Sequence, residues 1–265
     1  MNNDIEKCIS RYRPFQWNGL TWYPITIEYW EEFEQFSNVL RIMQQSMDIK
    51  YLSLTYLRML VQVDLDTIIL GKNRSNLVLN LFKLLCLSLK LDYKVYEREE
   101  IDFSIVPIRL IEEDNKQLYL LIRQENKEVK ISELEFIRLR ELIAKANDID
   151  IPDEATNLEL MEWEREKAKE NAKDLMLDFK YVIGAVAAYQ GKRESDYYDY
   201  SILEFNNLSN SVNRLINNGI YSLADMSGLV KFEKGNPYPS WCYPKKRELV
   251  EVENADSISR KQSLL

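Results

Sequence analysis

Histidine is absent from this 265-residue chain, and its absence narrows the chemistry available to the protein. Without an imidazole the chain lacks the usual general base, the Ser-His and Cys-His nucleophile pairs and the commonest metal ligand. Any catalysis would have to use carboxylates, lysine or tyrosine. Cysteine is scarce, and Cys8, Cys86 and Cys242 lie too far apart for a disulfide framework or a zinc motif. We therefore expect no metal site, no cofactor and a reducing compartment.

Glycine and proline occur only seven times each, which disfavours a turn-rich all-β fold and favours helices. Basic residues are outnumbered by acidic ones, and the formal net charge is −8. Binding to a nucleic-acid backbone needs a basic face that neutralises phosphates, so this charge argues against a nucleic-acid partner. With 46% hydrophobic residues, the chain can still bury a substantial core.

Long apolar runs are also missing. The most apolar stretch, Leu77 to Leu91, is interrupted by asparagine, serine and two lysines, so it predicts an amphipathic core helix rather than a membrane anchor. Residues 1–4 lack the basic-then-apolar pattern of a secretory signal. We therefore expect a cytoplasmic protein without a membrane partner.

The stretch from Asp174 to Phe232 predicts two packed helices around which we expect the chain to be organised. In the first helix, one face carries Leu175, Phe179, Val182, Val186 and Tyr189, spaced by three or four residues, and we expect it to be buried. In the second, starting near Ser201, the same spacing joins Ile202, Phe205, Leu208, Val212 and Leu215. We predict that the second helix ends at Asn217-Asn218-Gly219, which can supply a left-handed C-cap.

The rest of the chain predicts a mainly α fold with a small antiparallel β insertion, that is, an α+β class. A β-hairpin is predicted where Phe15-Gln16-Trp17 and Thr21-Trp22-Tyr23 flank Asn18-Gly19. Helices are predicted from the cap Thr26 to about Met43, over 53–70, and from Ser75 or Asn76 to about Lys90. A further helix is predicted from a Ser132–Glu135 capping box to about Ala146. Short β-rich runs cover 93–96, 105–110, 117–123 and 128–131.

These patterns divide the chain into four parts. We expect the hairpin and helices over residues 1–90, the β insertion over 91–131 and a C-terminal helical part over 132–235. Residues 159–173 within the third part are rich in Glu, Lys, Arg and Ala, which indicates a solvated helix or hinge. Residues 236–265 contain prolines and then charged residues and serines, so we expect an extended, disordered tail.

Three short motifs superficially suggest ligand sites. Asp64-Leu65-Asp66 resembles an acidic metal-binding pair, but residues two apart on a helix point to different faces. Asp148, Asp150, Asp153 and Glu154 lack the glycine and terminal glutamate of a calcium loop, and 71–75 lacks the ending of a phosphate loop. We therefore predict no catalytic, cofactor or metal residues.

Four large aromatic rings lie within fourteen residues, at Trp17, Trp22, Tyr23 and Trp30. A hairpin of this size cannot hide them all by itself, so they either cap the helical core or form a partner-binding surface. They are our candidate partner-binding residues. Gly184 and Ala188 remove bulk from one helix face, which favours tight helix packing or, alternatively, a groove for a partner.

Three blocks of sequence carry a resemblance to a known family. They are the hairpin block over 14–24, the segment from Phe136-Ile137-Arg138 through Asn147 to Glu154, and the segment from Tyr200 to Phe205 and on to Ser227–Phe232. Together these blocks resemble tail assembly chaperones of long-tailed bacteriophages and prophages of Gram-positive bacteria.

The resemblance implies a chaperone and not an enzyme. Such a protein would bind the long helical tape-measure protein and help to recruit tail-tube subunits in the host cytoplasm, with self-association left open. The alternative interpretation is a structural virion or connector protein, or a phage regulatory protein, that acts through protein contacts. An enzyme is the third class, and it would require a concave pocket with convergent carboxylates.

Overall fold

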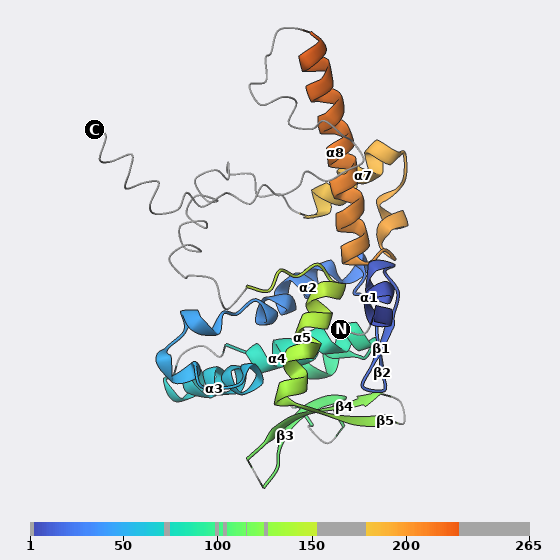
Figure 1. The fold of residues 1–265 in the computed structure, drawn as a ribbon. Coiled ribbons are helices and arrows are strands. Elements are labelled where there is room, and N and C mark those ends of the chain that lie inside the picture. The colour runs from blue at the N-terminus through green and yellow to red at the C-terminus, as the bar shows by residue number, and fades with distance from the viewer. Residues whose placement is uncertain are drawn as a thin grey trace, which may run out of the picture. The chain divides into compact units, whose positions relative to one another are not determined.

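The computed structural model describes residues 3–71, 75–98, 101–102, 105–114, 116–124, 127–152 and 179–227 (Figure 1). The described chain is mainly helical, with a two-stranded and a three-stranded antiparallel sheet, which confirms the predicted fold class. It divides into two compact units, Met1–Asn207 and Leu208–Leu265, which are described separately. The expected hinge at 159–173 and tail at 236–265 lie outside the described residues.

The N-terminal hairpin follows a helix that the sequence analysis missed. Helix α1 covers Asn3–Ser10 and buries Ile5 and Ile9, one helical turn apart. Strands β1 (Phe15–Trp17) and β2 (Leu20–Trp22) pair antiparallel, as predicted. Asn18 and Gly19 have φ angles of 48° and 74°, which match a type I′ turn, so this local signal was sufficient to place the hairpin.

The helices after the hairpin begin later or end earlier than predicted. Thr26 makes no side-chain cap, and a 3-10 turn, η1 (Ile27–Tyr29), precedes α2 (Trp30–Ser37). The α-helix ends six residues before Met43, and the chain continues in 3-10 turns η2 (Asn38–Leu40) and η3 (Gln44–Ser46). After η4 (Ile49–Tyr51), helix α3 covers Tyr56–Ile69.

Helix α4 (Leu77–Leu89) is the central element of the first unit. Eight of its last nine residues are buried, and it packs against α2, α3, β2, β3 and the 3-10 turns η2 and η5. Lys90 ends it with a φ of 54°. The expectation that the chain is organised around residues 174–232 is therefore wrong. Among the described residues, most buried apolar side chains lie before residue 150, and α4 contributes more of them than α7 does.

In the described part of the β insertion three of the four predicted runs form strands. Strands β3 (Ile108–Glu112), β4 (Leu118–Gln124) and β5 (Lys127–Ser132) form an antiparallel sheet in the order β3-β4-β5. The run at 93–96 forms instead a 3-10 turn, η5 (Tyr93–Glu97), because Asp92 caps the Lys94 N–H and the spacing of three residues buries both Tyr93 and Tyr96. The Tyr96 hydroxyl donates to the Ile108 carbonyl at 2.6 Å, which attaches this turn to β3.

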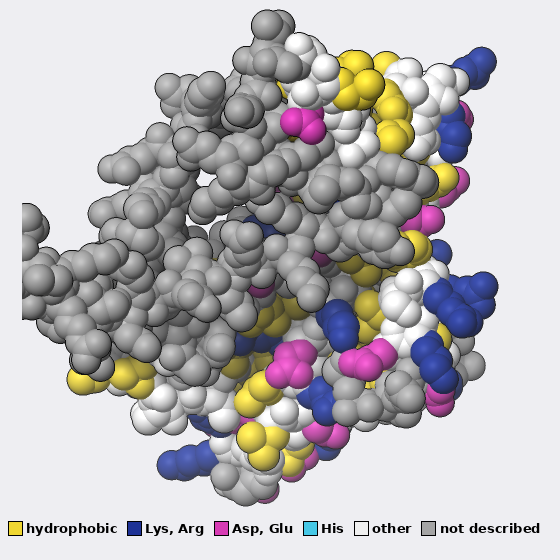
Figure 2. All heavy atoms as spheres, turned by 45° about the horizontal axis from the view of Figure 1, so that its top comes forward, with side chains coloured by type: hydrophobic (Ala, Val, Ile, Leu, Met, Phe, Trp, Pro, Cys, Tyr) yellow, Lys and Arg dark blue, Asp and Glu magenta, His cyan; other side chains and the backbone are white. Residues whose placement is uncertain are grey.

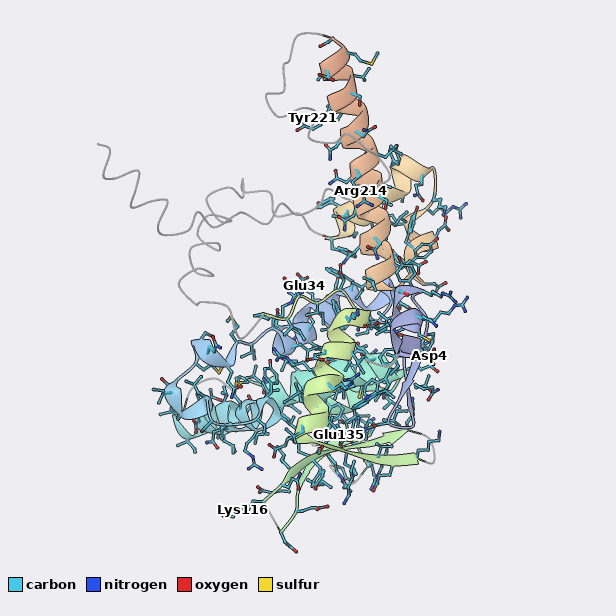
Figure 3. The ribbon with its side chains drawn as sticks, in the orientation of Figure 1. Asp4, Glu34, Lys116, Glu135, Arg214 and Tyr221 are labelled. Atoms are coloured by element: carbon cyan, nitrogen blue, oxygen red, sulfur yellow. The ribbon has the colours of Figure 1, made fainter. Side chains whose placement is uncertain are left out.

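Helix α5 (Glu133–Ala146) begins at the predicted capping box. The Ser132 hydroxyl accepts from the Glu135 N–H at 3.3 Å, and the Glu135 carboxylate accepts from the Ser132 N–H at 2.9 Å. Figure 3 labels Glu135 at the start of α5, beside the sheet. A buried carboxylate next to it, Glu133, accepts from Arg58 of α3 at 2.8 Å and from the Leu118 N–H of β4 at 3.0 Å. These bonds tie α3, α5 and the sheet together.

The C-terminal helices differ from prediction in burial and in length. Helix α7 is described over Phe179–Gln190 and buries Ile183, Val186 and Ala187, whereas Tyr189 is exposed. The 3-10 turn η6 (Glu194–Tyr197) follows, and α8 runs over Ile202–Met226. The predicted end at Asn217-Asn218-Gly219 is wrong. Gly219 continues the helix because apolar residues recur at helical spacing on both sides of it, and one interior glycine costs only about 1 kcal/mol.

Asp64 provides a polar anchor for the start of α4. Its carboxylate accepts from the N–H groups of Leu77 and Val78 at 3.0 and 2.8 Å, and from the Ser75 hydroxyl. A carboxylate here satisfies two unpaired donors of the first turn and also interacts favourably with the helix dipole. The cap comes from a neighbouring helix, so the motif at 64–66 has a structural role at its first residue.

We expect Asp64→Ala to lower the free energy of unfolding by about 1–2 kcal/mol, because the N–H groups of Leu77 and Val78 in the first turn of α4 lose their acceptor. The measurement is urea unfolding followed by circular dichroism. Asp48→Ala is the matched control, since Asp48 precedes η4 but makes no side-chain cap, and we expect it to change stability by less than about 0.5 kcal/mol. Equal losses in both variants would contradict the capping role.

Candidate functional site

The four candidate aromatic residues do not form one surface. Trp22 is completely buried, and its indole N–H donates to the Trp17 carbonyl at 3.2 Å. It is therefore not available to a partner, and its place among the candidate binding residues is corrected. Trp17 is half-buried and meets Trp22 edge to face, with 6.3 Å between ring centroids. Tyr23 is half-buried beneath the Lys90 ammonium, 4.6 Å from the ring centroid.

Trp30 lies apart from the hairpin and belongs to a different site. Its ring stacks on Phe179 of α7, with 3.6 Å between centroids and 17° between the ring planes. Phe33 packs on it from its own helix, with the ring centroids 5.8 Å apart. Trp30 is half-buried, so one part of the ring holds α2 to α7 and the remainder faces a recess.

This recess, called the α2 groove below, has a volume of about 500 Å³. It is lined by Ile27, Glu28, Trp30, Glu31, Glu32, Glu34, Phe179, Lys180, Ile183 and Tyr198. The apolar lining comes from Ile27, Trp30, Phe179 and Ile183, whereas Glu28, Glu31 and Glu34 are exposed. Glu34 is labelled on α2 in Figure 3. The groove thus combines apolar side chains with a rim of exposed carboxylates.

A neighbouring hollow of about 770 Å³ shares Glu28 and Glu32 with the α2 groove. Its further lining residues are Thr26, Tyr29, Leu87, Lys90, Leu91, Asp92, Tyr93, Lys94 and Asp199. Glu32 accepts from the Tyr93 hydroxyl at 3.0 Å. Burial is the main cause that raises the pKa of Tyr93 to about 12, and the hydrogen bond to Glu32 is the next largest. The phenol therefore stays protonated at neutral pH and holds the Glu32 carboxylate between the two hollows.

The acidic pairs that resembled metal sites are used for other contacts. Asp66 accepts from Lys50 at 2.5 Å, Tyr51 at 2.7 Å and Gln62 at 2.8 Å, and these hydrogen bonds lower its pKa to about 2. Asp64 caps α4, so the two carboxylates serve different elements. Asp148 accepts from Asn206 at 2.9 Å, and its would-be partners Asp153 and Glu154 lie outside the described residues. Within the described ranges, no three His, Cys, Asp or Glu residues gather as a cation would require.

The small residues of α7 face a side chain and not a second backbone. A Cβ on Gly184 would lie 3.0 Å from a Glu194 carboxylate oxygen of η6. Ala187 is buried, whereas Ala185 and Ala188 are exposed. The predicted tight packing therefore involves Gly184 and Ala187, where the loop after α7 folds back onto its helix.

The second unit contributes an exposed apolar stripe on α8. Its members lie at helical spacing and are Leu215, Ile216, Ile220, Leu223 and Met226, with exposed fractions that rise from 39% at Ile216 to 84% at Met226. The opposite face carries mostly polar and charged residues, including Asn210, Arg214 and Asn217. Figure 2 shows hydrophobic side chains reaching the surface among polar ones in the described part of the chain. The wrongly predicted helix end at Gly219 excluded most of this stripe, although the apolar residues continue at helical spacing beyond Gly219.

Comparisons with protein-family models, with curated proteins and with solved structures found no match. Among the helices of the described residues, none combines the length and the apolarity needed to cross a bilayer. The fold and its surfaces therefore define the class only broadly, as a mainly helical α+β protein with an acidic groove and an apolar helix face.

The glutamates of the α2 groove were the functional candidates that sequence reasoning missed. Glu28, Glu31, Glu32 and Glu34 surround Trp30 in the sequence, and this alternation of acidic residues with aromatic ones is the signal that could have found them. It could not have identified Phe179, which reaches the same groove from a distant helix.

Proposed function

We propose that the protein is a tail assembly chaperone of a long-tailed phage or prophage, which binds the tape-measure protein and assists tail-tube assembly in the host cytoplasm. The observation that carries the proposal is the exposed apolar stripe of α8, from Leu215 to Met226. The resemblance of three sequence blocks supplies the family. One of these blocks forms the β1–β2 hairpin, and another spans α8.

An exposed apolar stripe suits a protein that holds a helical client. Contiguous apolar surface is costly in water, and large exposed patches mark interaction sites. A partner helix can lay its apolar face along such a stripe through contacts at the same spacing of three and four residues. A tape-measure protein, as a long helical chain, presents such faces repeatedly. In this proposal the protein acts by contact and not by catalysis.

Co-expression with tape-measure fragments from the same genome tests the proposal. We expect the protein to keep such a fragment soluble and to co-purify with it, and a chelator to leave the complex intact because we predict no metal. Ile220→Glu with Leu223→Glu should reduce the recovered fragment at least about tenfold, since charges would be placed on the contact face. Asn210→Glu with Asn217→Glu adds the same charge to the polar face of the helix, and recovery should be unchanged.

Two results would count against the chaperone. Failure to co-purify with any tail protein would show that the protein has no client in the tail. Equal losses in the two α8 variants would show that the apolar stripe does not form the contact. Detection of the protein as a stoichiometric component of finished particles would instead favour the structural virion or connector class.

A further inference from the structure

The α2 groove combines two features that select a particular kind of partner. Part of its lining is apolar, with the stacked pair Trp30–Phe179 and the buried Ile183. Its rim is acidic, with four glutamates against Lys180 among the lining residues. The apolar lining favours apolar side chains of a partner, whereas the acidic rim favours positively charged side chains and disfavours negatively charged ones.

We infer that the α2 groove docks a helical segment of another polypeptide in which lysine or arginine flanks an apolar face. The biological meaning of this inference rests on the proposed function, because the α2 groove would then be the surface that selects the client by its charge. The chemistry itself follows from the groove.

The spacing of the rim carboxylates fits a helix better than a single ion. Glu28, Glu31 and Glu34 follow one another at three-residue steps along η1 and α2, and all three are exposed. At about 2.0 Å of rise per residue in the 3-10 turn and about 1.5 Å in the α-helix they span roughly 10 Å, which is close to the span of positions i, i+3 and i+7 on a partner helix. Within the described residues these carboxylates do not converge on one point as a metal would require.

The aromatic residues at the groove provide a second contribution to binding cations. The exposed Tyr198 lines the groove, and Trp30 presents part of its ring there. An ammonium or guanidinium over such a ring is attracted by the negative potential of the ring face. Glutamate and aromatic side chains together thus favour Lys or Arg at the edges of the bound segment.

Charge also distinguishes a partner from the chain's own segments. Residues 153–178, which directly precede Phe179, contain nine Asp or Glu and four Lys or Arg, so they would repel the rim. Residues 228–265 contain seven Lys or Arg and five Asp or Glu, including the run Lys245-Lys246-Arg247. This basic run is the competing occupant, and the experiment below includes it.

The test uses the full-length protein and a labelled 18-residue peptide of leucine and lysine arranged as an amphipathic helix, read by fluorescence anisotropy. Matched peptides carry glutamate in place of lysine, or the same residues in a scrambled order. We expect the basic amphipathic peptide to bind at least about tenfold more tightly than either, and its affinity to fall with added salt. Equal binding of the three peptides would overturn the inference.

Paired variants assign the binding to the groove. Glu28→Lys with Glu31→Lys should weaken binding of the basic peptide about tenfold, because the rim loses its charge. Asp48→Lys with Glu141→Lys changes the net charge equally at exposed positions that do not line the groove, and the affinity should stay within about twofold. Equal weakening in both pairs would overturn the assignment by showing attraction to net charge alone. A thermal melt confirms that each variant is folded.

A third variant, Lys245→Glu with Lys246→Glu and Arg247→Glu, tests the chain's own tail. Unchanged affinity supports a separate partner, whereas a rise of more than about fivefold would show that the tail occupies the groove and would overturn the assignment to a partner. The peptide result is separate from co-purification with tape-measure fragments. Peptide binding without any tail client would leave the groove assignment standing and reject the chaperone, and the reverse outcome would reject only the groove.

Discussion

We expect Phe205→Ala to lower the free energy of unfolding by about 3–5 kcal/mol, the typical cost of truncating a buried phenylalanine. Phe205 is completely buried at the start of α8, within the first unit. Its ring meets Phe179 and Tyr197 edge to face, at centroid distances of 5.4 and 5.7 Å. Truncation would leave a cavity and would also remove two aromatic contacts, which stabilise a fold by more than the burial of their apolar surface alone.

Thermal and urea unfolding measure this effect. Leu215→Ala is the control on the same helix, because Leu215 is 42% exposed and its truncation should cost far less. If Phe205→Ala melts with the wild type, the contacts that join α7, η6 and the start of α8 do not contribute to the cooperative core. That result would also place the Trp30–Phe179 stack, and with it the α2 groove, outside the stable part of the fold.

The second large effect is expected at Arg140, a buried cation. Its guanidinium lies 3.7 Å from the centroid of the Tyr56 ring and donates twice to the Leu40 carbonyl, at 3.0 and 2.7 Å. We expect Arg140→Met to cost about 2–4 kcal/mol, because methionine fills similar space but leaves a buried carbonyl without its donors. These hydrogen bonds connect α5 to the last residue of the 3-10 turn η2, which follows α2.

Two further variants separate charge from geometry at this position. Arg140→Lys should recover only part of the loss, since an ammonium cannot reproduce the two parallel donors or the stacking on Tyr56. Arg138→Met, at an exposed site on the same helix, should change stability by less than about 0.5 kcal/mol. A loss at position 138 equal to that at 140 would show that the effect belongs to the surface charge of α5.

The predicted elements that the structure confirms depended on signals contained within a few residues. Asn18-Gly19 accepts positive φ angles, so the hairpin turn follows from the dipeptide itself. Ser132 and Glu135 cap each other's N–H groups, so the start of α5 is also local. The three strands and the helices α3 and α4 follow from apolar period and from breakers such as Gly71, with errors of a few residues at their ends.

The errors arose where tertiary contacts outweighed a local signal. The run at 93–96 has the composition of a strand, but Tyr93 and Tyr96 are drawn into the core together, and a 3-10 turn presents them on one side. Gly219 has the sequence of a C-cap, but the helix continues through it. The burial of Trp22 and the half-exposure of Trp30 could not be separated in sequence, since both are tryptophans within the same aromatic stretch.

The candidate site shows the same division. By itself, the sequence determined the acidic charge, the absence of histidine chemistry, the α+β class and the residues of α2 that carry Trp30 and its glutamates. Only the tertiary structure decided that Phe179 and Ile183 join them from α7 to form the α2 groove. The physical reason is one of range: capping and helical periodicity act within a few residues, whereas burial and groove formation depend on apolar side chains that meet across more than a hundred residues of chain.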